Sequence, residues 1–276
     1  MIYSYDMEWI DAIILGLVQG ITEFLPVSST GHLVLVHDWL SLDKTNALAF
    51  DAILHFATTA AVIIYFWPDL WRLLQVALRK LSRLPVNQKD ITLLYALLVG
   101  TVPAVLIGLL LEDIVDLYLR KPVIVAGVLF SASLFFLFAE WKYYLKPPQA
   151  EITFKKGILI GFFQALALIP GMSRSGATIA GGMLLGLNRY EATRFSFLLS
   201  IPIIMGVGIK MSLDLLKQGG AIDWVVIATG AGIAFITAII VIHFFLQFIR
   251  KYTLWPFVWY GIILSALVAY VSIFTI

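Results

Sequence analysis

Long apolar stretches alternate with short polar connections along the chain, and the apolar stretches fall into two length classes. A helix needs about 20 predominantly apolar residues to cross the hydrocarbon core of a bilayer. Six stretches reach that length, at 47–67, 91–111, 122–141, 190–209, 224–248 and 254–275. The pattern therefore predicts an all-α polytopic membrane protein with six transmembrane helices.

Four further apolar stretches are too short to span a bilayer, and they flank two polar loops, 26–32 and 170–176, in pairs. The short stretches are 9–21, 33–40, 157–169 and 177–187. Each pair with its loop predicts a re-entrant helical hairpin, at 9–40 and 157–187, which enters and leaves the membrane on one side. Bare backbone at that depth is tolerated only where protein or a water-filled cavity surrounds it. The alternative is one kinked span per pair.

The order of elements repeats, with one hairpin and three spans in 1–146 and again in 151–276. Residues Gly16, Gln19, Pro26 and Gly31 of the first hairpin find counterparts in Gly161, Gln164, Pro170 and Gly176. Because three is an odd number of spans, the second repeat would lie upside down relative to the first, as in inverted-repeat transporters. We expect one integral membrane domain in which the hairpin tips meet near the midplane.

Composition agrees with a membrane protein and narrows its chemistry. Hydrophobic residues make up 61% of the 276 and charged residues 13%, with a mean hydropathy of +0.95. These values exclude a soluble domain, whose apolar share is about half. The absence of cysteine excludes disulfides and thiolate chemistry. The expected partners are the bilayer and a lipid substrate, with no nucleic acid, and a homodimer stays open.

Basic residues are distributed unequally between the two sides of the predicted membrane domain. One side has 12, Arg72, Arg79, Lys80, Arg83, Lys89, Lys142, Lys146, Lys155, Lys156, Arg189, Arg250 and Lys251, and the other has 5, Lys44, Arg120, Lys121, Lys210 and Lys217. The richer side is expected to be cytoplasmic. Both termini would then be extracytoplasmic.

The first polar loop combines groups suited to phosphate chemistry. Glu23 lies one helical turn after Gln19, so both can reach one ligand or cation. Hydroxyl residues 28–30 precede a short helix, whose N-terminus favours anions, although a serine there is also a plain N-cap. His32 lies three residues after Ser29 and can accept the serine proton, as nucleophile activation requires. Ser29 is thus the predicted nucleophile, and a metal-bound water held by Glu23 is the alternative.

The second polar loop supplies a cation. Arg174 presents a rigid donor fork that suits phosphate oxygens, and Gly171 and Gly176 allow the close backbone approach that builds an anion-binding nest. A purely structural bridge between Arg174 and Glu23 is the alternative.

Other ionisable residues at membrane depth are interpreted as packing partners, because an isolated buried His or Asp is more often satisfied by its neighbours than catalytic. These residues are Asp51, His55, Glu191 and Arg194.

At the two loops the chain resembles the bacterial undecaprenyl-diphosphate phosphatases, also called bacitracin-resistance proteins. The resemblance rests on 20–32 (GITEFLPVSSTGH), on 170–178 (PGMSRSGAT) and on 181–183 (GGM), and it covers essentially the whole chain. One departure is Gln19, where many members have Glu. A metal site built on two carboxylates is therefore in doubt here.

The resemblance implies hydrolysis of undecaprenyl diphosphate to undecaprenyl phosphate and inorganic phosphate in the bacterial inner membrane, which recycles the lipid carrier for cell-wall polymers. A divalent cation, Mg²⁺ or Ca²⁺, is the expected cofactor. The expected site has Ser29, His32 and Glu23 as catalytic residues, Glu23 and Gln19 as metal ligands, and substrate-binding Arg174, Ser28, Thr30, Ser173, Ser175, Gly176 and Thr178.

The rival class is a carrier, either a prenyl-phosphate flippase or an anion transporter with inverted repeats. The architecture suits a carrier equally well, because fold does not fix function. The combination of Ser29, His32 and Glu23 favours an enzyme, since a carrier needs anion donors but no nucleophile and base.

Overall fold

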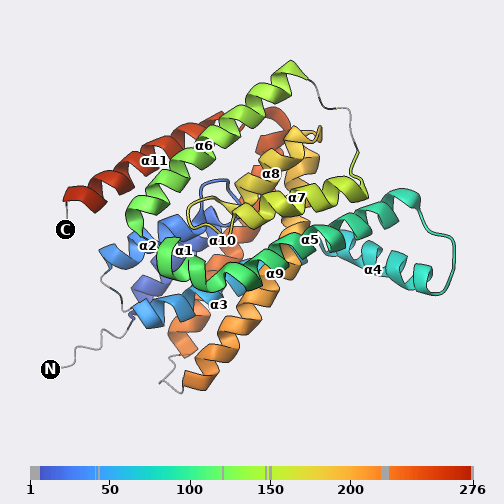
Figure 1. The fold of residues 1–276 in the computed structure, drawn as a ribbon. Coiled ribbons are helices and arrows are strands. Elements are labelled where there is room, and N and C mark those ends of the chain that lie inside the picture. The colour runs from blue at the N-terminus through green and yellow to red at the C-terminus, as the bar shows by residue number, and fades with distance from the viewer. Residues whose placement is uncertain are drawn as a thin grey trace.

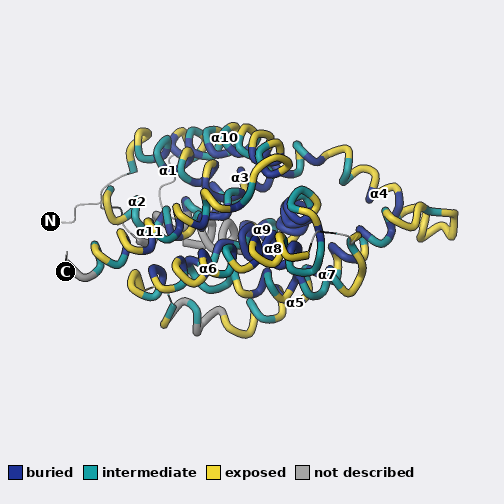
Figure 2. Tube along the Cα trace, turned by 90° about the horizontal axis from the view of Figure 1, so that it is seen from above, coloured by how far each residue is buried: buried dark blue, intermediate teal, exposed yellow. Residues whose placement is uncertain are grey.

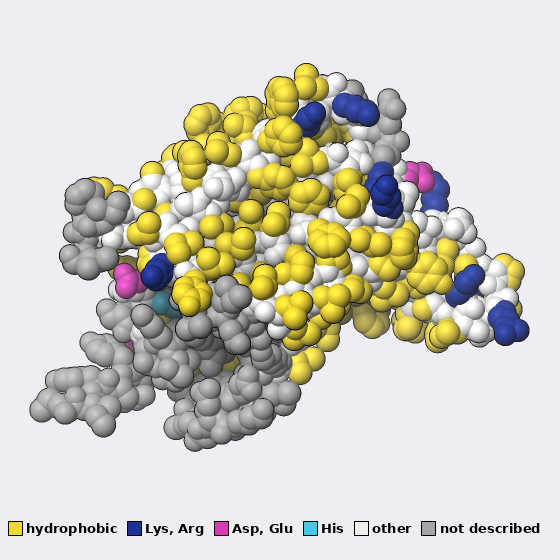
Figure 3. Space-filling view, in the orientation of Figure 1, with side chains coloured by type: hydrophobic (Ala, Val, Ile, Leu, Met, Phe, Trp, Pro, Cys, Tyr) yellow, Lys and Arg dark blue, Asp and Glu magenta, His cyan; other side chains and the backbone are white. Residues whose placement is uncertain are grey.

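The computed structural model describes residues 7–40, 42, 44–119, 121–146, 148, 151–218 and 224–274, and the regular structure in these residues is all helical. Within these residues there are eleven α-helices and one π-helical turn (Figure 1). The predicted all-α class is confirmed. Hydrophobic side chains cover most of the face in Figure 3, and the visible Lys and Arg side chains lie toward its edges, as expected of a surface that meets lipid.

Short helices occur in two pairs, at the positions of the predicted hairpins. The first pair is α1 (Trp9–Thr22) and α2 (Ser29–Trp39), and the second is α7 (Phe154–Leu166) and α8 (Arg174–Leu184). The longest of the four, α1, has 14 residues. At 1.5 Å per residue it is about 21 Å long, which falls short of the hydrocarbon thickness of about 30 Å.

Long helices follow each pair. In the first half they are α3 (Lys44–Tyr65), α5 (Gln88–Ile114) and α6 (Pro122–Leu145), and a π-helical turn, η1 (Val115–Leu119), follows α5. In the second half they are α9 (Arg189–Gln218), α10 (Trp224–Lys251) and α11 (Trp255–Phe274).

Within the described residues, four of the long helices are sufficiently long and apolar to cross a membrane, namely α5, α6, α10 and α11. A fifth candidate is α3 together with α4 (Trp67–Leu81), which is bent by 75° relative to α3. The predicted count of six spans is not confirmed. The predicted stretch 190–209 does lie in α9, but the first two turns of that helix carry Arg189, Glu191 and Arg194.

Helix α4 is an element that the apolar pattern did not predict. It has Pro68 in its first turn and packs Leu73 and Val76 inward. The side chains of Trp67 and Trp71 stack on each other and are exposed. Figure 2 shows α4 extending away from the rest of the molecule, while α8 lies buried in the middle.

Glycines allow the first helix of each hairpin, α1 or α7, to approach a long helix of the other half. A Cβ on Gly16 of α1 would lie 2.6 Å from the carbonyl oxygen of Gly230 in α10, and one on Gly161 of α7 would collide with Gly100 in α5. Helix α1 accordingly packs against α10, and α7 packs against α5. These two close contacts fix each hairpin against the other half of the chain.

Candidate active site

The two polar loops meet, although they are far apart in the sequence. Nη2 of Arg174 donates to Oε1 of Glu23 at 2.8 Å, and Oγ of Ser175 donates to the carbonyl oxygen of Leu25 at 3.0 Å. The ring of Phe24 is fully buried and packs edge-to-face on Phe197 at 5.1 Å between centroids, which anchors the first loop in the core. The expected contact between hairpin tips is therefore present.

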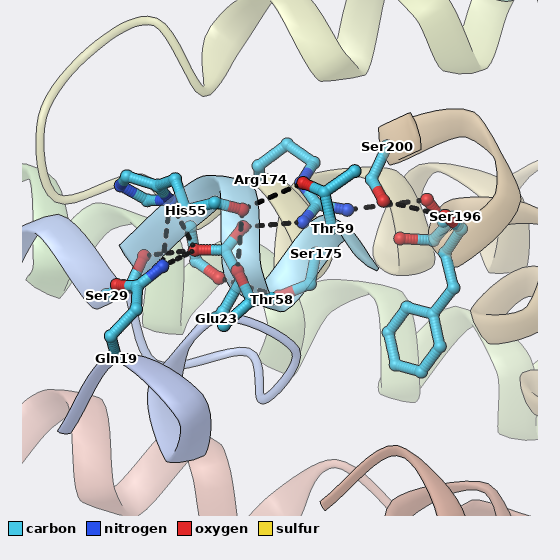
Figure 4. A network of polar contacts seen from close by, with 12 residues as sticks. Gln19, Glu23, Ser29, His55, Thr58, Thr59, Arg174, Ser175, Ser196 and Ser200 are labelled. Carbon is cyan, nitrogen blue, oxygen red and sulfur yellow. Dashed lines mark hydrogen bonds and ion pairs between the residues drawn. The ribbon is translucent and has the colours of Figure 1, made fainter. Parts of the chain in front are cut away.

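The carboxylate of Glu23 is the hub of the site. Glu23 ends α1 and is only 7% exposed. Its Oε2 accepts hydrogen bonds from Oγ of Ser29 at 2.8 Å and from Nε2 of Gln19 at 3.0 Å. Nδ1 of His55 lies 3.1 Å from the same oxygen. Figure 4 shows Gln19, Ser29 and His55 on one side of this carboxylate and Arg174 on the other, so its charge is compensated within the protein.

His55, which the sequence interpretation assigned to the packing partners, lines the cavity and contacts Gln19 and Glu23. It comes from α3, where the hydroxyls of Thr58 and Thr59 both donate to its carbonyl oxygen, at 2.9 and 2.8 Å. No local pattern in the sequence marks His55, because its contact with Glu23 arises from the packing of α3 beside α1. The other three residues of that group have partners outside the site: Asp51 lies 3.2 Å from His37, and Arg194 pairs with Asp69 at 2.6 Å and Glu191 at 3.8 Å.

His32 does not meet Ser29 as expected. Its Nδ1 lies 2.8 Å from the carbonyl oxygen of Ser28, and its Nε2 lies 2.6 Å from the hydroxyl of Tyr260 in α11. The His32 and Tyr260 rings stack with their centroids 5.6 Å apart. The ring is turned back along α2 and toward α11, so the proton acceptor within reach of Ser29 is Glu23.

The second helices of the two hairpins, α2 and α8, begin with the same N-cap conformation. Ser28 and Ser173 are the N-caps, with φ angles of 67° and 61°, and their side chains accept hydrogen bonds from the N–H groups of Gly31 and Gly176. Non-glycine residues rarely adopt this left-handed region, and such strain gathers at functional sites. The N-cap alternative given for the first loop therefore holds at Ser28, and Ser173 has the same role in the second hairpin, where its hydroxyl also lies 3.2 Å from that of Ser175.

A cavity of about 180 Å³ opens between the loops. Of the predicted site residues, Glu23, Ser28, Ser29, Thr30, Ser173 and Arg174 line it. His55 and Gln164 line it as well, and Ala104, Ala167, Leu168, Ile169, Pro170, Gly171, Ile203 and Ile204 complete the wall. Hydroxyls, two helix N-termini and one guanidinium in a mostly apolar wall suit a phosphate group.

Five of the predicted residues lie outside the cavity lining, and one of them is Gln19, whose contacts with Glu23 and His55 lie behind the cavity wall. His32 and Ser175 have the partners given above, and Thr178 is fully buried with its hydroxyl 2.6 Å from that of Ser196. A Cβ on Gly176 would collide with the ring of Phe136. Gly176 thus allows close packing of α8 against α6, and its N–H donates to the side chain of Ser173.

Arg174 has a second hydrogen bond besides the one to Glu23. Its Nη1 donates to the carbonyl oxygen of Ser196 in α9 at 3.4 Å. The Arg174–Glu23 bridge that was the structural alternative does exist, but Arg174 also lines the cavity and is only partly buried. The two roles are therefore compatible.

Oxygen ligands for a divalent cation are few. No group of three or more His, Asp or Glu residues that could hold a metal occurs in the described part of the chain. Oε1 of Gln19, however, is buried without a hydrogen-bond partner, while Nε2 of the same amide donates to the Glu23 carboxylate. One carboxylate and one carbonyl oxygen fit Mg²⁺, which usually takes one or two protein ligands and completes its shell with phosphate oxygens and water.

An almost wholly apolar recess of about 530 Å³ adjoins the cavity. Leu168 and Ile169 belong to the walls of both. The rest of the recess is formed by Ile107, Leu111, Val115, Leu119, Leu159, Phe162, Phe163, Ala165 and Leu166.

Comparisons with known proteins identify the family of this chain. The family described as "Bacitracin resistance protein BacA" matches residues 12–267. An undecaprenyl-diphosphatase of Rubrobacter xylanophilus is 42% identical over 95% of this chain and 98% of its own length. Undecaprenyl-diphosphatases of Idiomarina loihiensis and Micrococcus luteus are 40% and 39% identical, over 97% and 94% of this chain and 100% and 95% of their own lengths. The chain therefore belongs to the bacitracin resistance protein BacA family.

Proposed function

We infer that this chain is an undecaprenyl-diphosphate phosphatase: it hydrolyses undecaprenyl diphosphate to undecaprenyl phosphate and inorganic phosphate. The observation that carries this conclusion is the contact between Ser29 and Glu23 in a cavity that Arg174 also lines. A hydroxyl bonded to a carboxylate beside a fixed guanidinium provides a nucleophile, a proton acceptor and an anion ligand.

In the proposed first step, Oγ of Ser29 attacks the terminal phosphorus and its proton passes to Oε2 of Glu23. The new Oγ–P bond forms as the anhydride P–O bond breaks, and undecaprenyl phosphate leaves with the bonding electron pair. A water molecule then hydrolyses the phosphoserine and releases inorganic phosphate. The geometry supports Glu23 as the base, because the Ser29 hydroxyl already points at it at 2.8 Å.

The remaining residues support this step. Arg174 would bind non-bridging oxygens of the diphosphate while it orients Glu23. The N–H groups at the start of α2 and the hydroxyls of Ser28, Thr30 and Ser173 would bind others. His32 is a positioning residue in this proposal, because it holds the carbonyl of Ser28 next to the nucleophile.

A divalent cation, Mg²⁺ or Ca²⁺, remains part of the proposal, with Glu23 and Gln19 as its protein ligands. When bound with the substrate, it would neutralise charge on the diphosphate. The unpartnered Oε1 of Gln19 supports this assignment.

The prenyl chain is assigned to the apolar recess beside the cavity. Because Leu168 and Ile169 belong to both walls, a diphosphate in the cavity can keep its hydrocarbon tail among apolar side chains. The head group would then enter from the lipid phase.

The proposed setting is the bacterial inner membrane, with two inverted repeats, 1–146 and 151–276, and extracytoplasmic termini. The mirrored packing of α1 on α10 and α7 on α5 supports the repeats, since each hairpin contacts the second long helix of the other half. Both ends of the chain, 1–6 and 275–276, lie outside the described residues. A homodimer remains a prediction.

Proteoliposomes that contain the purified protein separate an enzyme from a carrier. With undecaprenyl diphosphate in the lipid, inorganic phosphate should appear in proportion to lost substrate, and a chelator should reduce its release. Transfer of intact undecaprenyl diphosphate between leaflets without phosphate release would favour the flippase instead.

A further inference from the structure

The second hairpin carries a buried amide without a partner. Gln164 of α7 is only 2% exposed, and neither Nε2 nor Oε1 of its side chain has a hydrogen-bond partner. A buried amide left without hydrogen bonds is costly, and most buried polar side chains in proteins have a partner. An unpaired amide that persists at a cavity therefore points to a ligand as the missing partner.

The position of Gln164 is fixed by tight helix packing. Gly157, Gly161 and Gln164 follow one face of α7, at spacings of four and three residues. A Cβ on either glycine would collide with the backbone of Ala96 or Gly100 in α5. Four residues beyond Gly100, Ala104 lines the cavity together with Gln164. The α5–α7 contact thus leads directly to the cavity wall and leaves the Gln164 backbone little freedom.

The matching residue of the first hairpin shows why Gln164 is available. Gln19 occupies the corresponding place in α1, three residues after Gly16 as Gln164 is three after Gly161. Nε2 of Gln19 is taken by Glu23 and His55. No carboxylate occupies the equivalent place in the second hairpin, where Leu168 follows Gln164 by four residues. The amide of Gln164 therefore keeps both donor hydrogens for a ligand.

We propose that Gln164 is a substrate-binding residue whose side-chain amide donates to an oxygen of the diphosphate. This assignment rests on the proposed function. Arg174 and Ser29 come from the two loops, and Gln164 adds a neutral donor from the wall formed by α7. A neutral amide can donate hydrogen bonds to the anion. A second positively charged side chain at this place would instead compete with Arg174 for Glu23.

The test is a replacement that separates binding from folding. Gln164→Leu keeps the side-chain size and removes a polar group that is unpaired in the free protein. Its midpoint of thermal unfolding in detergent should therefore be equal to or higher than that of wild type. The value of kcat/KM for the prenyl diphosphate should fall about tenfold or more, since hydrogen bonds to charged groups are strong. Most of the loss should lie in KM, because the contact exists in the ground state.

Two further variants sharpen the result. Gln164→Glu replaces the donor by a negative charge and should lose more activity than Gln164→Leu. Gln247→Leu makes the same chemical change at an exposed residue of α10, outside the cavity, and should behave as wild type.

Inorganic diphosphate provides a readout that does not depend on hydrolysis. It should raise the unfolding temperature of the wild-type protein, and Gln164→Leu should weaken that effect. Unchanged kcat/KM and unchanged protection by diphosphate in Gln164→Leu would overturn the assignment. A large loss of thermal stability in Gln164→Leu would also overturn it, because the amide would then be a structural group. Failure of the proposed function is distinct: wild type would bind diphosphate but release no phosphate from the lipid.

Discussion

Arg174 and Glu23 are separated by 151 positions in the sequence, yet Nη2 of one donates to Oε1 of the other at 2.8 Å. This ion pair joins the tips of two hairpins that belong to different halves of the chain. It places a guanidinium, a carboxylate and the Ser29 hydroxyl around one small cavity. The proposed chemistry of the protein depends on that junction.

Arg174→Lys tests whether the guanidinium serves the substrate in addition to Glu23. Lysine keeps the positive charge, so the pairing with Glu23 and the unfolding temperature should change little. It loses the bidentate fork, so kcat/KM should fall at least about tenfold, or about 1.4 kcal/mol of transition-state stabilisation. Arg72→Lys, at an exposed arginine of α4, is the matched control. Near-normal turnover would leave Arg174 a structural bridge only.

His55→Phe tests the site residue that the sequence interpretation missed. The ring nitrogen of His55 lies 3.1 Å from the Glu23 carboxylate, and phenylalanine removes that contact while it keeps an aromatic ring of similar size. Phosphate release should fall about tenfold or more, because Glu23 loses one of the groups that orient it. His243→Phe, at an exposed histidine of α10, should retain full activity. Equal activity of the two variants would return His55 to the packing partners.

Gly176→Ala tests the packing role of a glycine that was expected to approach the ligand. Its new methyl group would collide with the Phe136 ring, and overpacking of this kind costs about 1–3 kcal/mol. The unfolding temperature in detergent should therefore drop, and Phe136→Leu in the same chain should restore part of it. Gly127→Ala is the control, because a Cβ there meets no atom within 4 Å. A stable Gly176→Ala protein without activity would favour the ligand role.

A reporter that is active only in the cytoplasm tests the inverted arrangement. The bias of basic residues predicts an extracytoplasmic C-terminus. Fused after residue 276, the reporter should stay silent, and fused in the loop between α4 and α5 it should be active. A strong signal at the C-terminus would contradict the proposed topology.

Much of this architecture could be predicted, because it depends on periodic and local signals. Stretches of about 20 apolar residues predicted the long helices, and pairs of shorter stretches predicted the two pairs of short helices. The N-cap at Ser28 was one of two interpretations of the first loop, and the one at Ser173 was not predicted. Helix α4 was not predicted because it is amphipathic. Its charged residues interrupt the apolar pattern, so the segment was interpreted as a connection rich in basic residues.

The site was predicted less completely, because it depends on the directions of side chains in three dimensions. Spacing alone suggested that His32 could reach Ser29, but the ring hydrogen-bonds back to Ser28 and to Tyr260 of α11, a distant part of the chain. His55 joined the site only through the packing of α3 beside α1. Such long-range contacts leave no local pattern in the sequence.

Phosphate release by purified protein in detergent tests the central claim most directly. With undecaprenyl diphosphate as substrate, wild type should release inorganic phosphate. Ser29→Ala and Glu23→Gln should each lose about 100-fold or more, and the double variant should be scarcely worse, because the two residues act as a unit. His32→Ala, which lacks contact with Ser29, should lose less than either. Two results together would contradict attack by Ser29 with Glu23 as its base. They are appreciable turnover by Ser29→Ala, and a loss of activity in the double variant equal to the product of the losses in the two single variants.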